Sequence, residues 1–122
     1  QRAYAELPAY CKGFSVCLMP FALNESTEHI NPTKTLEYMA SGKPVVSSAV
    51  PDVISNFGSI VSVAGSHEEF IELCRRAVGN PDRQAIERGL RLANENTWES
   101  IVAKLETHIG AALLKKHAEV LA

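Results

Sequence analysis

Residues 29–37 combine residue types that could bind a phosphorylated ligand. The residues concerned are His29, Asn31, Pro32, Thr33, Lys34 and Glu37. Asn followed by Pro is typical of a helix start, with Asn31 at the N-cap and Pro32 at the first helical position. The first turn of that helix, which also contains Thr33 and Lys34, holds no acidic residue. Its free backbone N–H groups and the Lys34 charge are therefore available to an anion such as phosphate or diphosphate.

Glu37 lies one helical turn after this candidate anion site. Because it follows Thr33 and Lys34 at helical spacing, all three side chains can project to the same side of the helix. A carboxylate behind a phosphate site can accept two hydrogen bonds from the vicinal hydroxyls of a ribose, as the acidic residue does in dinucleotide-binding folds. The pattern thus indicates a nucleotide site. A plainer interpretation stays open, in which Lys34 and Glu37 form a surface ion pair and Asn31 only caps the helix.

Three short apolar segments around these residues predict the strands of a sheet. Residues 14–20 are almost continuously apolar, which indicates a strand buried on both faces, as in a parallel sheet. Residues 43–47 and 59–63 predict two further strands. A polar loop over 22–30 and a helix that ends before Gly42 connect the first two strands.

Along the chain, helices are expected before and after each of these strands. The expected positions are a helix over 6–13, a helical turn at 51–54, and helices that begin at Ser66, Pro81 and Thr97. Strands that alternate with helices indicate a parallel sheet with right-handed crossovers. The expected fold class is therefore α/β: a partial doubly wound, Rossmann-like parallel sheet of about three strands with flanking helices and a long C-terminal helix.

The last helix, over 98–120, would be roughly 35 Å long, which is more than a three-stranded core can cover. The apolar residues expected to lack cover there are Leu113, Leu114, Val120 and Leu121. A doubly wound sheet normally has five or six strands, and the chain begins with Gln1 rather than Met. We therefore expect a piece of a larger domain, whose open sheet edge and uncovered helix favour self-association.

Composition excludes several classes of protein. The 122 residues carry a net charge of −2 and no basic block, which argues against nucleic acid as the partner. Cys11, Cys17 and Cys74 are too few and too scattered for a disulfide framework or a zinc site, so we expect reduced thiols and no bound metal. No stretch could span a bilayer and no signal peptide is visible, so a cytoplasmic location is expected.

The segment NPTKTLEYMASGKPVV at residues 31–46 resembles the donor-site segment of group 1 retaining glycosyltransferases with the GT-B fold. The subgroup it resembles has the pattern (S/N)-P-x-K-x-x-E-Y-x-A-x-G-K-P-V-V. The flanks agree in Tyr4, ELP at 6–8, Tyr10, PDV at 51–53 and Trp98. The resemblance covers nearly the whole chain.

The resemblance implies that residues 1–122 are the C-terminal part of a nucleotide-sugar-binding domain. Such an enzyme transfers a sugar from a nucleotide diphosphate sugar to an acceptor with retained configuration, and no metal or cofactor besides this donor substrate is implied. Glu37 corresponds to the second glutamate of the family's E-x7-E motif and would bind the ribose. The backbone of residues 31–33 would hold the diphosphate, and residues 2–4 lie where the family contacts the nucleobase. The implied partners are the nucleotide sugar and an N-terminal domain that binds the acceptor.

One departure from the family pattern affects the donor sugar. The position eight before Glu37 is His29, whereas the family has a glutamate there that faces the sugar. In this chain the donor sugar would be contacted by His29, Glu28 or Glu25 in place of that glutamate, or by no residue at this position. His29 could hydrogen-bond a sugar hydroxyl or a phosphate, although a lone loop histidine is more often only solvated.

Two alternative functions remain to be weighed. A receiver-type signalling domain needs aspartates clustered at strand ends, but the first strand ends in Pro20 and Phe21 and the chain has only two aspartates, Asp52 and Asp82. The stronger alternative is a non-catalytic nucleotide-binding or assembly module with the same half-Rossmann fold. Whether the chain is part of a glycosyltransferase or such a module, the chain by itself is expected to lack transferase activity.

Overall fold

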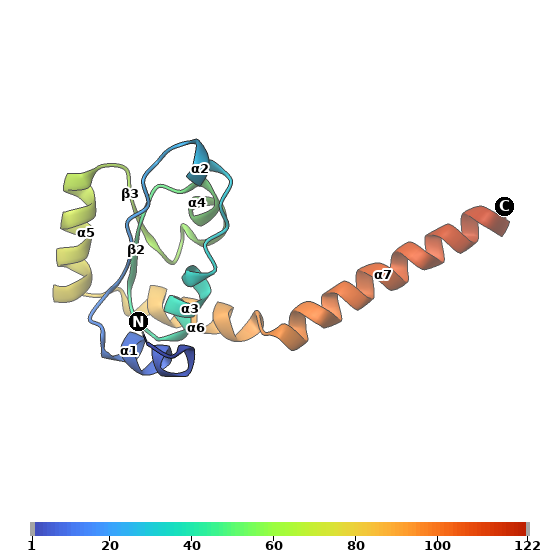
Figure 1. The fold of residues 1–122 in the computed structure, drawn as a ribbon, viewed down its shortest axis with the longest axis horizontal. Helices are drawn as coiled ribbons and strands as arrows, with labels where there is room; N and C mark the ends of the chain where they lie inside the picture. The colour runs from blue at the N-terminus through green and yellow to red at the C-terminus, as the bar shows by residue number, and fades with distance from the viewer. Residues whose placement is uncertain (1, 122) are drawn as a thin grey trace.

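A three-stranded parallel sheet forms the centre of the fold (Figure 1). The computed structural model describes residues 2–121, and the side chain of Leu121 lies outside the described part. Along the chain the elements are η1 (Tyr4–Glu6), α1 (Leu7–Gly13), β1 (Cys17–Met19), α2 (Glu25–Glu28), α3 (Lys34–Ala40), β2 (Val45–Ser48), α4 (Pro51–Phe57), β3 (Ser62–Ala64), α5 (His67–Gly79), α6 (Arg83–Glu95) and α7 (Trp98–Leu121). The strands are neighbours in the order β1-β2-β3, with Leu18 opposite Val46 and Val46 opposite Ser62. The predicted α/β class and the long C-terminal helix are confirmed.

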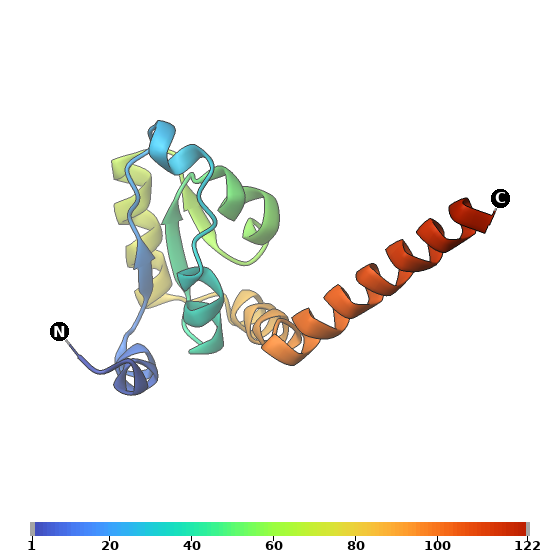
Figure 2. The same cartoon turned by 45° about the vertical axis from the view of Figure 1, so that its right-hand side comes forward.

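Helices cover both faces of the sheet (Figures 1 and 2). The connections from β1 to β2 and from β2 to β3 step in the same direction across the sheet, so right-handed crossovers put α3 and α4 on one face. α6 packs against α3. α5 follows the last strand and lies against β2 and β3 on the opposite face.

The core lies between the sheet and α3, α4 and α6. Val46, Val50 and Val53 are fully buried. Gly89 lets α6 approach α3 closely, because a Cβ atom at this position would lie 3.1 Å from Met39 Cγ and 3.2 Å from the Cγ2 atom of Ile60. These contacts hold α3, and with it the candidate ligand residues, against the sheet.

Three expectations about the first crossover need correction. The strand predicted over 14–20 is only Cys17–Met19. It is not buried on both faces, since Leu18 is 42% exposed. β1 is an edge strand that pairs only with β2, and α5 covers β2 and β3 instead. The loop over 22–30 contains the short helix α2, which begins where the Asn24 side chain accepts a hydrogen bond from the Ser26 N–H (3.0 Å).

The end of α3 agrees with the sequence. Ser41 forms the C-cap, and Gly42 follows it with a φ of 71°. A glycine adopts this left-handed conformation without the steric cost that a Cβ atom would cause. The chain then turns directly into β2.

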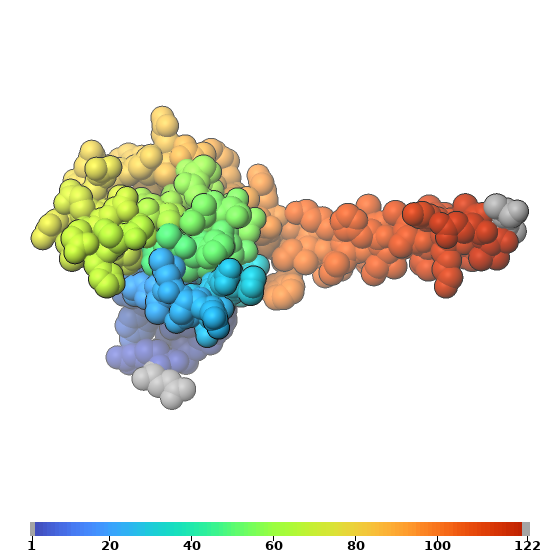
Figure 3. Space-filling model, turned by 90° about the horizontal axis from the view of Figure 1, so that it is seen from above, coloured from blue at the N-terminus to red at the C-terminus, as the bar shows by residue number. Residues whose placement is uncertain are grey.

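The helix α7 leaves the body of the molecule and projects away from it (Figure 3). Its 24 residues include many large apolar side chains that are exposed, among them Leu113, Leu114 and Val120. The expectation that these residues lack cover is confirmed, whereas Leu121 lies outside the described side chains. Over the described residues, none of the helices combines the length and the apolar character needed to cross a bilayer.

Candidate functional site

The helix that carries Lys34 and Glu37 begins later than the sequence predicts. Thr33 stands at the N-cap of α3 with helical dihedral angles (φ −56°, ψ −28°) and without a side-chain cap hydrogen bond. Pro32 is buried, and its carbonyl oxygen accepts hydrogen bonds from the Thr35 N–H (3.0 Å) and the Thr35 hydroxyl (2.8 Å). The expected N-cap at Asn31 and helical position of Pro32 are therefore wrong. Burial of Pro32 and Thr35 decides where the helix starts.

This later start moves Glu37 into the first turn of α3. The expectation of a first turn without an acidic residue is therefore wrong. α3 has only seven residues, and its own acid partly satisfies the helix dipole. An anion at this place would depend mainly on the Lys34 charge. Asn31, Thr33, Lys34 and Glu37 are all exposed, so a ligand could reach them.

Tyr4 and Glu37 come together although they are far apart in the sequence. The Tyr4 hydroxyl donates a long hydrogen bond of 3.4 Å to Glu37 Oε1. Both residues line a cavity of about 240 Å³ beside α1 and α3. The other lining residues are Leu7, Pro8, Cys11, Lys12, Ala40 and Ser41. Of the segment over 2–4, Tyr4 therefore lies beside Glu37 at the same cavity.

The charged groups around this cavity are accessible. Glu37 and Lys12 are exposed, and the Glu37 carboxylate has acceptor capacity beyond its contact with Tyr4. The guanidinium of Arg2 lies over the Tyr10 ring, 5.4 Å from its centroid, a cation–π contact that holds the N-terminal segment against α1.

The buried groups behind the cavity have a structural role. The Ser41 hydroxyl donates to the Tyr38 carbonyl (2.6 Å) and lies 3.9 Å from Cys17 Sγ. Burial raises the pKa of the Cys17 thiol, against the lowering effect of its contact with Ser41. Burial also raises the pKa of the Tyr38 phenol. Both groups stay protonated at neutral pH, so neither supplies a nucleophile or a general base.

His29 lies at a different end of the structure from the Tyr4 cavity. It is the C-cap of α2, and Glu25 and Glu28 are residues of that helix. All three side chains are exposed. In Figures 1 and 2, α1 lies near the amino end of β1, α2 lies beyond its carboxyl end, and α3 lies between them. The structure therefore does not bring His29 together with Glu37 at one cavity.

A larger cavity of about 810 Å³ lies at the carboxyl ends of the strands, where ligands of open α/β sheets bind. Residues 20–23, Ser48 and residues 64–68 line it, together with Phe70 and Ile71 from α5. Its wall is mainly apolar, and the candidate residues on α3 do not line it. Ser48 donates hydrogen bonds to the carbonyl oxygens of Phe21 (2.8 Å) and Met19 (3.4 Å), which ties the two strand ends together.

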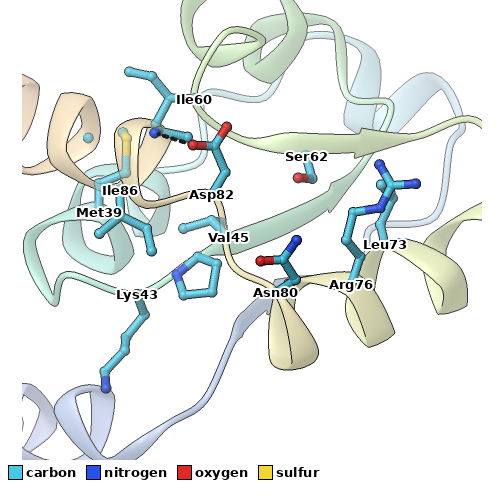
Figure 4. Close-up of a pocket in the computed structure, with 14 residues that line it drawn as sticks. Met39, Lys43, Val45, Ile60, Ser62, Leu73, Arg76, Asn80, Asp82 and Ile86 are labelled. Carbon is cyan, nitrogen blue, oxygen red and sulfur yellow. Dashed lines mark hydrogen bonds between the residues drawn. The ribbon is translucent and has the colours of Figure 1, made fainter.

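A third cavity, near the amino end of β2, is too small for a nucleotide (Figure 4). Its volume is about 70 Å³, whereas ligand sites need about 300 Å³ or more. Asp82, one of its lining residues, accepts a hydrogen bond from the Ala85 N–H (3.0 Å) and so caps α6. This cavity is a packing gap between α5, α6 and the sheet. Across residues 2–121, no three His, Cys, Asp or Glu side chains are grouped to hold a metal ion.

The sequence interpretation missed the part of the site that α1 contributes. Leu7, Pro8, Cys11 and Lys12 all line the Tyr4 cavity. Their spacing is that of one helix face, since residues three and four apart are neighbours on a helix surface. This periodicity was available in the sequence, but it does not say what the face contacts.

Comparison with known proteins identifies the family of this chain. The profile of the family described as "Glycosyl transferases group 1" matches residues 1–80, which is more than half of the chain. The chain belongs to the group 1 glycosyltransferases. The matched residues include Tyr4, Lys34, Glu37 and every other residue that lines the Tyr4 cavity.

A curated relative of this chain comes from Bacillus subtilis (strain 168). Its name is "Putative teichuronic acid biosynthesis glycosyltransferase TuaH", and it is 27% identical over 117 residues. The match covers 93% of the present chain and 29% of the relative. The chain therefore spans less than a third of the length of this relative. No solved structure matches the chain.

Proposed function

We propose that this chain forms the C-terminal part of the nucleotide-sugar-binding domain of a retaining GT-B glycosyltransferase. In the whole enzyme, the domain would bind a nucleotide diphosphate sugar and present it to an acceptor held by an N-terminal domain. The observation that carries the proposal is the meeting of Tyr4 and Glu37 at one cavity inside the segment that matches the family.

In this proposal the nucleoside half of the donor binds between α1 and α3. The Glu37 carboxylate accepts hydrogen bonds from the two ribose hydroxyls, and the Tyr4 hydroxyl already lies beside that carboxylate. Leu7 and Pro8 supply apolar surface for the base. The cavity of about 240 Å³ is below the usual range of whole-ligand sites, which suits binding of only the nucleoside part of the donor.

The remaining parts of the donor would follow α3 toward α2. Lys34 and the exposed backbone around Thr33 would hold the diphosphate, with the Lys34 charge as the main contribution. The sugar would then lie near His29, Glu28 and Glu25. The spatial order α1, α3, α2 (Figure 2) supports this arrangement, because it matches the order of base, ribose, diphosphate and sugar.

We propose that transfer needs no metal ion. As the sugar leaves the diphosphate, negative charge develops on the leaving group, and Lys34 with neighbouring backbone N–H groups would stabilise it. A turnover assay of the whole enzyme with a chelator tests this part, and an absolute requirement for a divalent cation contradicts it.

Calorimetric titration with UDP, GDP and ADP tests the donor site. Each hydrogen bond to a charged group contributes about 1.5–3 kcal/mol, so Glu37→Ala should weaken binding of the preferred nucleotide by about ten-fold or more. Glu87→Ala is the matched control, because Glu87 is an exposed glutamate on α6. An unchanged dissociation constant for Glu37→Ala contradicts the ribose assignment.

A second variant separates the phosphate from the nucleoside. Thr33→Glu places a negative charge next to Lys34, so it should weaken the diphosphate more than the corresponding nucleoside. If this variant and the original chain have the same dissociation constant for the nucleoside diphosphate, the phosphate binds elsewhere. If the chain binds nucleotides but the whole enzyme transfers no sugar, the chain is a non-catalytic binding module.

A further inference from the structure

The Tyr4 cavity continues along α3 on the side of Glu37 that faces away from Lys34. The residues at 40 and 41, about one helical turn after Glu37, line the cavity. Lys34 lies one turn before Glu37 and does not line it. In a nucleotide, the base and the phosphates leave the ribose on opposite sides of its two hydroxyls. With the ribose at Glu37 and the diphosphate at Lys34, the base enters this part of the cavity. We call it the base end, and its lining residues are Cys11, Lys12, Ala40 and Ser41.

The polar groups of the base end differ in what they offer to a ligand. The Ser41 hydroxyl already donates a hydrogen bond to the Tyr38 carbonyl (2.6 Å). The Cys11 thiol is only a weak hydrogen-bonding group, and Ala40 has an apolar side chain. Lys12 is exposed in the last turn of α1, and its ammonium makes no ion pair within residues 2–121. The Lys12 ammonium is therefore the strong donor at this end that a ligand can reach.

On the basis of the nucleotide site proposed above, we propose that Lys12 hydrogen-bonds the base of the donor and selects uracil, so that the donor is a UDP-sugar. Lys12 stands about two helical turns after Tyr4 along η1 and α1, so it meets the edge of the base that is farthest from the ribose. A lysine ammonium has three donors and no acceptor. At that edge uracil has a carbonyl oxygen, which accepts a hydrogen bond, whereas cytosine and adenine have amino groups, which donate.

The cavity size and the role of Glu37 separate uracil from the other bases that have a carbonyl oxygen at this edge. Guanine has such a carbonyl, but it consists of two fused rings, and a cavity of about 240 Å³ is small for a ligand site. Thymine resembles uracil, but thymidine nucleotides carry deoxyribose, which lacks one of the two hydroxyls that Glu37 binds in this proposal. Uracil on a ribose therefore suits both ends of the cavity.

A lysine in the last turn of a helix also has a structural role that requires no ligand. Its positive charge interacts favourably with the helix dipole and with the last carbonyl groups of the helix. With that role alone, Lys12→Met would lower the thermal stability of the chain and leave its relative affinities for different bases unchanged. The ratio of the dissociation constants for two bases therefore distinguishes recognition of the base from stabilisation of α1.

Calorimetric titration of the chain with UDP and CDP tests the selection. The two ligands share the ribose, the diphosphate and the ring size, and their bases differ at position 4 and in the proton on the adjacent nitrogen. We expect UDP to bind about ten-fold more tightly than CDP. Lys12→Met keeps an apolar stem and removes the donor, so it should abolish this preference, mainly by weakening UDP. Lys104→Met is the matched control, because Lys104 is an exposed lysine on α7, and it should keep the preference.

Lys12→Glu gives the sharpest test, because it replaces a donor with an acceptor. This variant should reverse the preference, since a carboxylate accepts a hydrogen bond from the amino group of cytosine. The selection of uracil by Lys12 is overturned by equal binding of UDP and CDP to the original chain, by a preference that Lys12→Met retains, or by tighter binding of GDP than of UDP.

Glu37→Ala separates these outcomes from a failure of the proposed function. Nucleotides that bind in a manner dependent on Glu37, but without a preference among the bases, overturn the role of Lys12 and leave the donor site in place. If UDP, CDP and GDP all fail to bind, the nucleotide site itself is contradicted, and the role of Lys12 with it.

Discussion

The helices α6 and α7 both carry apolar residues at helical spacing, but within the described residues 2–121 the apolar face of α6 packs against the rest of the fold and most of that of α7 does not. Ile86, Leu90 and Ala93 of α6 are partly buried, and α6 packs closely on α3. The apolar residues Leu105 and Leu113 of α7 stay more than half exposed. The comparison shows that helical periodicity identifies the face that needs cover, whereas it does not identify what covers it.

The largest expected difference between the two regions concerns truncation of an apolar side chain. Met39, which is 2% exposed, contacts α6 in the core, so Met39→Ala should lower the free energy of unfolding by about 2–5 kcal/mol. Leu113→Ala on α7 should change it by less than about 0.5 kcal/mol in the monomer. Denaturant unfolding at low protein concentration measures the free energy of unfolding of both variants. Equal losses for the two variants would mean that α7 is part of the folded core.

A glycine in α6 and a glycine in α7 provide a second and smaller contrast. A Cβ atom at Gly89 in α6 would lie 3.1 Å from Met39 Cγ and 3.2 Å from Ile60 Cγ2, so these side chains would have to move slightly, whereas a Cβ atom at Gly110 in α7 would meet nothing within 4 Å. Gly89→Ala should destabilise the chain by about 1 kcal/mol through overpacking. Gly110→Ala should stabilise α7 by about 0.5–1 kcal/mol, because alanine has the higher helix propensity. Thermal unfolding, monitored by circular dichroism, shows whether each substitution raises or lowers the stability. If both substitutions raise it, the α3–α6 contact is looser than the structure indicates.

The smallest expected effect lies at the start of α7. A hydrogen bond from its own backbone N–H and one from the Thr97 side chain lower the pKa of Glu99 below 4.5. Because the pKa of the folded state is depressed, the stabilisation is present above the unfolded value and is lost as the pH falls through the folded value. An NMR titration should therefore give Glu99 a midpoint below the ordinary value of a glutamate side chain. A midpoint at the ordinary value would show that the start of α7 is frayed.

Much of the fold could be predicted from local patterns. The alternation of apolar segments and helix caps indicated three parallel strands, and Gly42 marked the end of α3 because only a residue without Cβ adopts a φ of 71° at low cost. The segment over 31–46 also marked the family, because its motif is contiguous in the sequence. Each of these features depends on residues that are close neighbours along the chain.

The start of α3 and the burial of β1 could not be predicted in this way. Asn31 has a strong capping preference, but packing of Pro32 and Thr35 in the core outweighs it and moves the helix start to Lys34. Leu18 was expected inside, yet β1 lies at the edge of the sheet, where α5 does not cover it. Local preferences differ by about 1 kcal/mol, whereas burial of a side chain contributes more, so packing decides such cases.

The sequence by itself therefore determined the order and type of most elements, and it predicted which residues would bind a nucleotide. Periodicity, caps and a contiguous motif are properties of short segments, and they persist wherever the segment lies. Only the tertiary structure decided that Tyr4 meets Glu37, that α1 contributes Cys11 and Lys12 to the same cavity, and that Leu105 and Leu113 of α7 stay exposed. These outcomes depend on which surfaces far apart in the chain pack together, because the free energy of burial is shared between segments and belongs to neither of them alone.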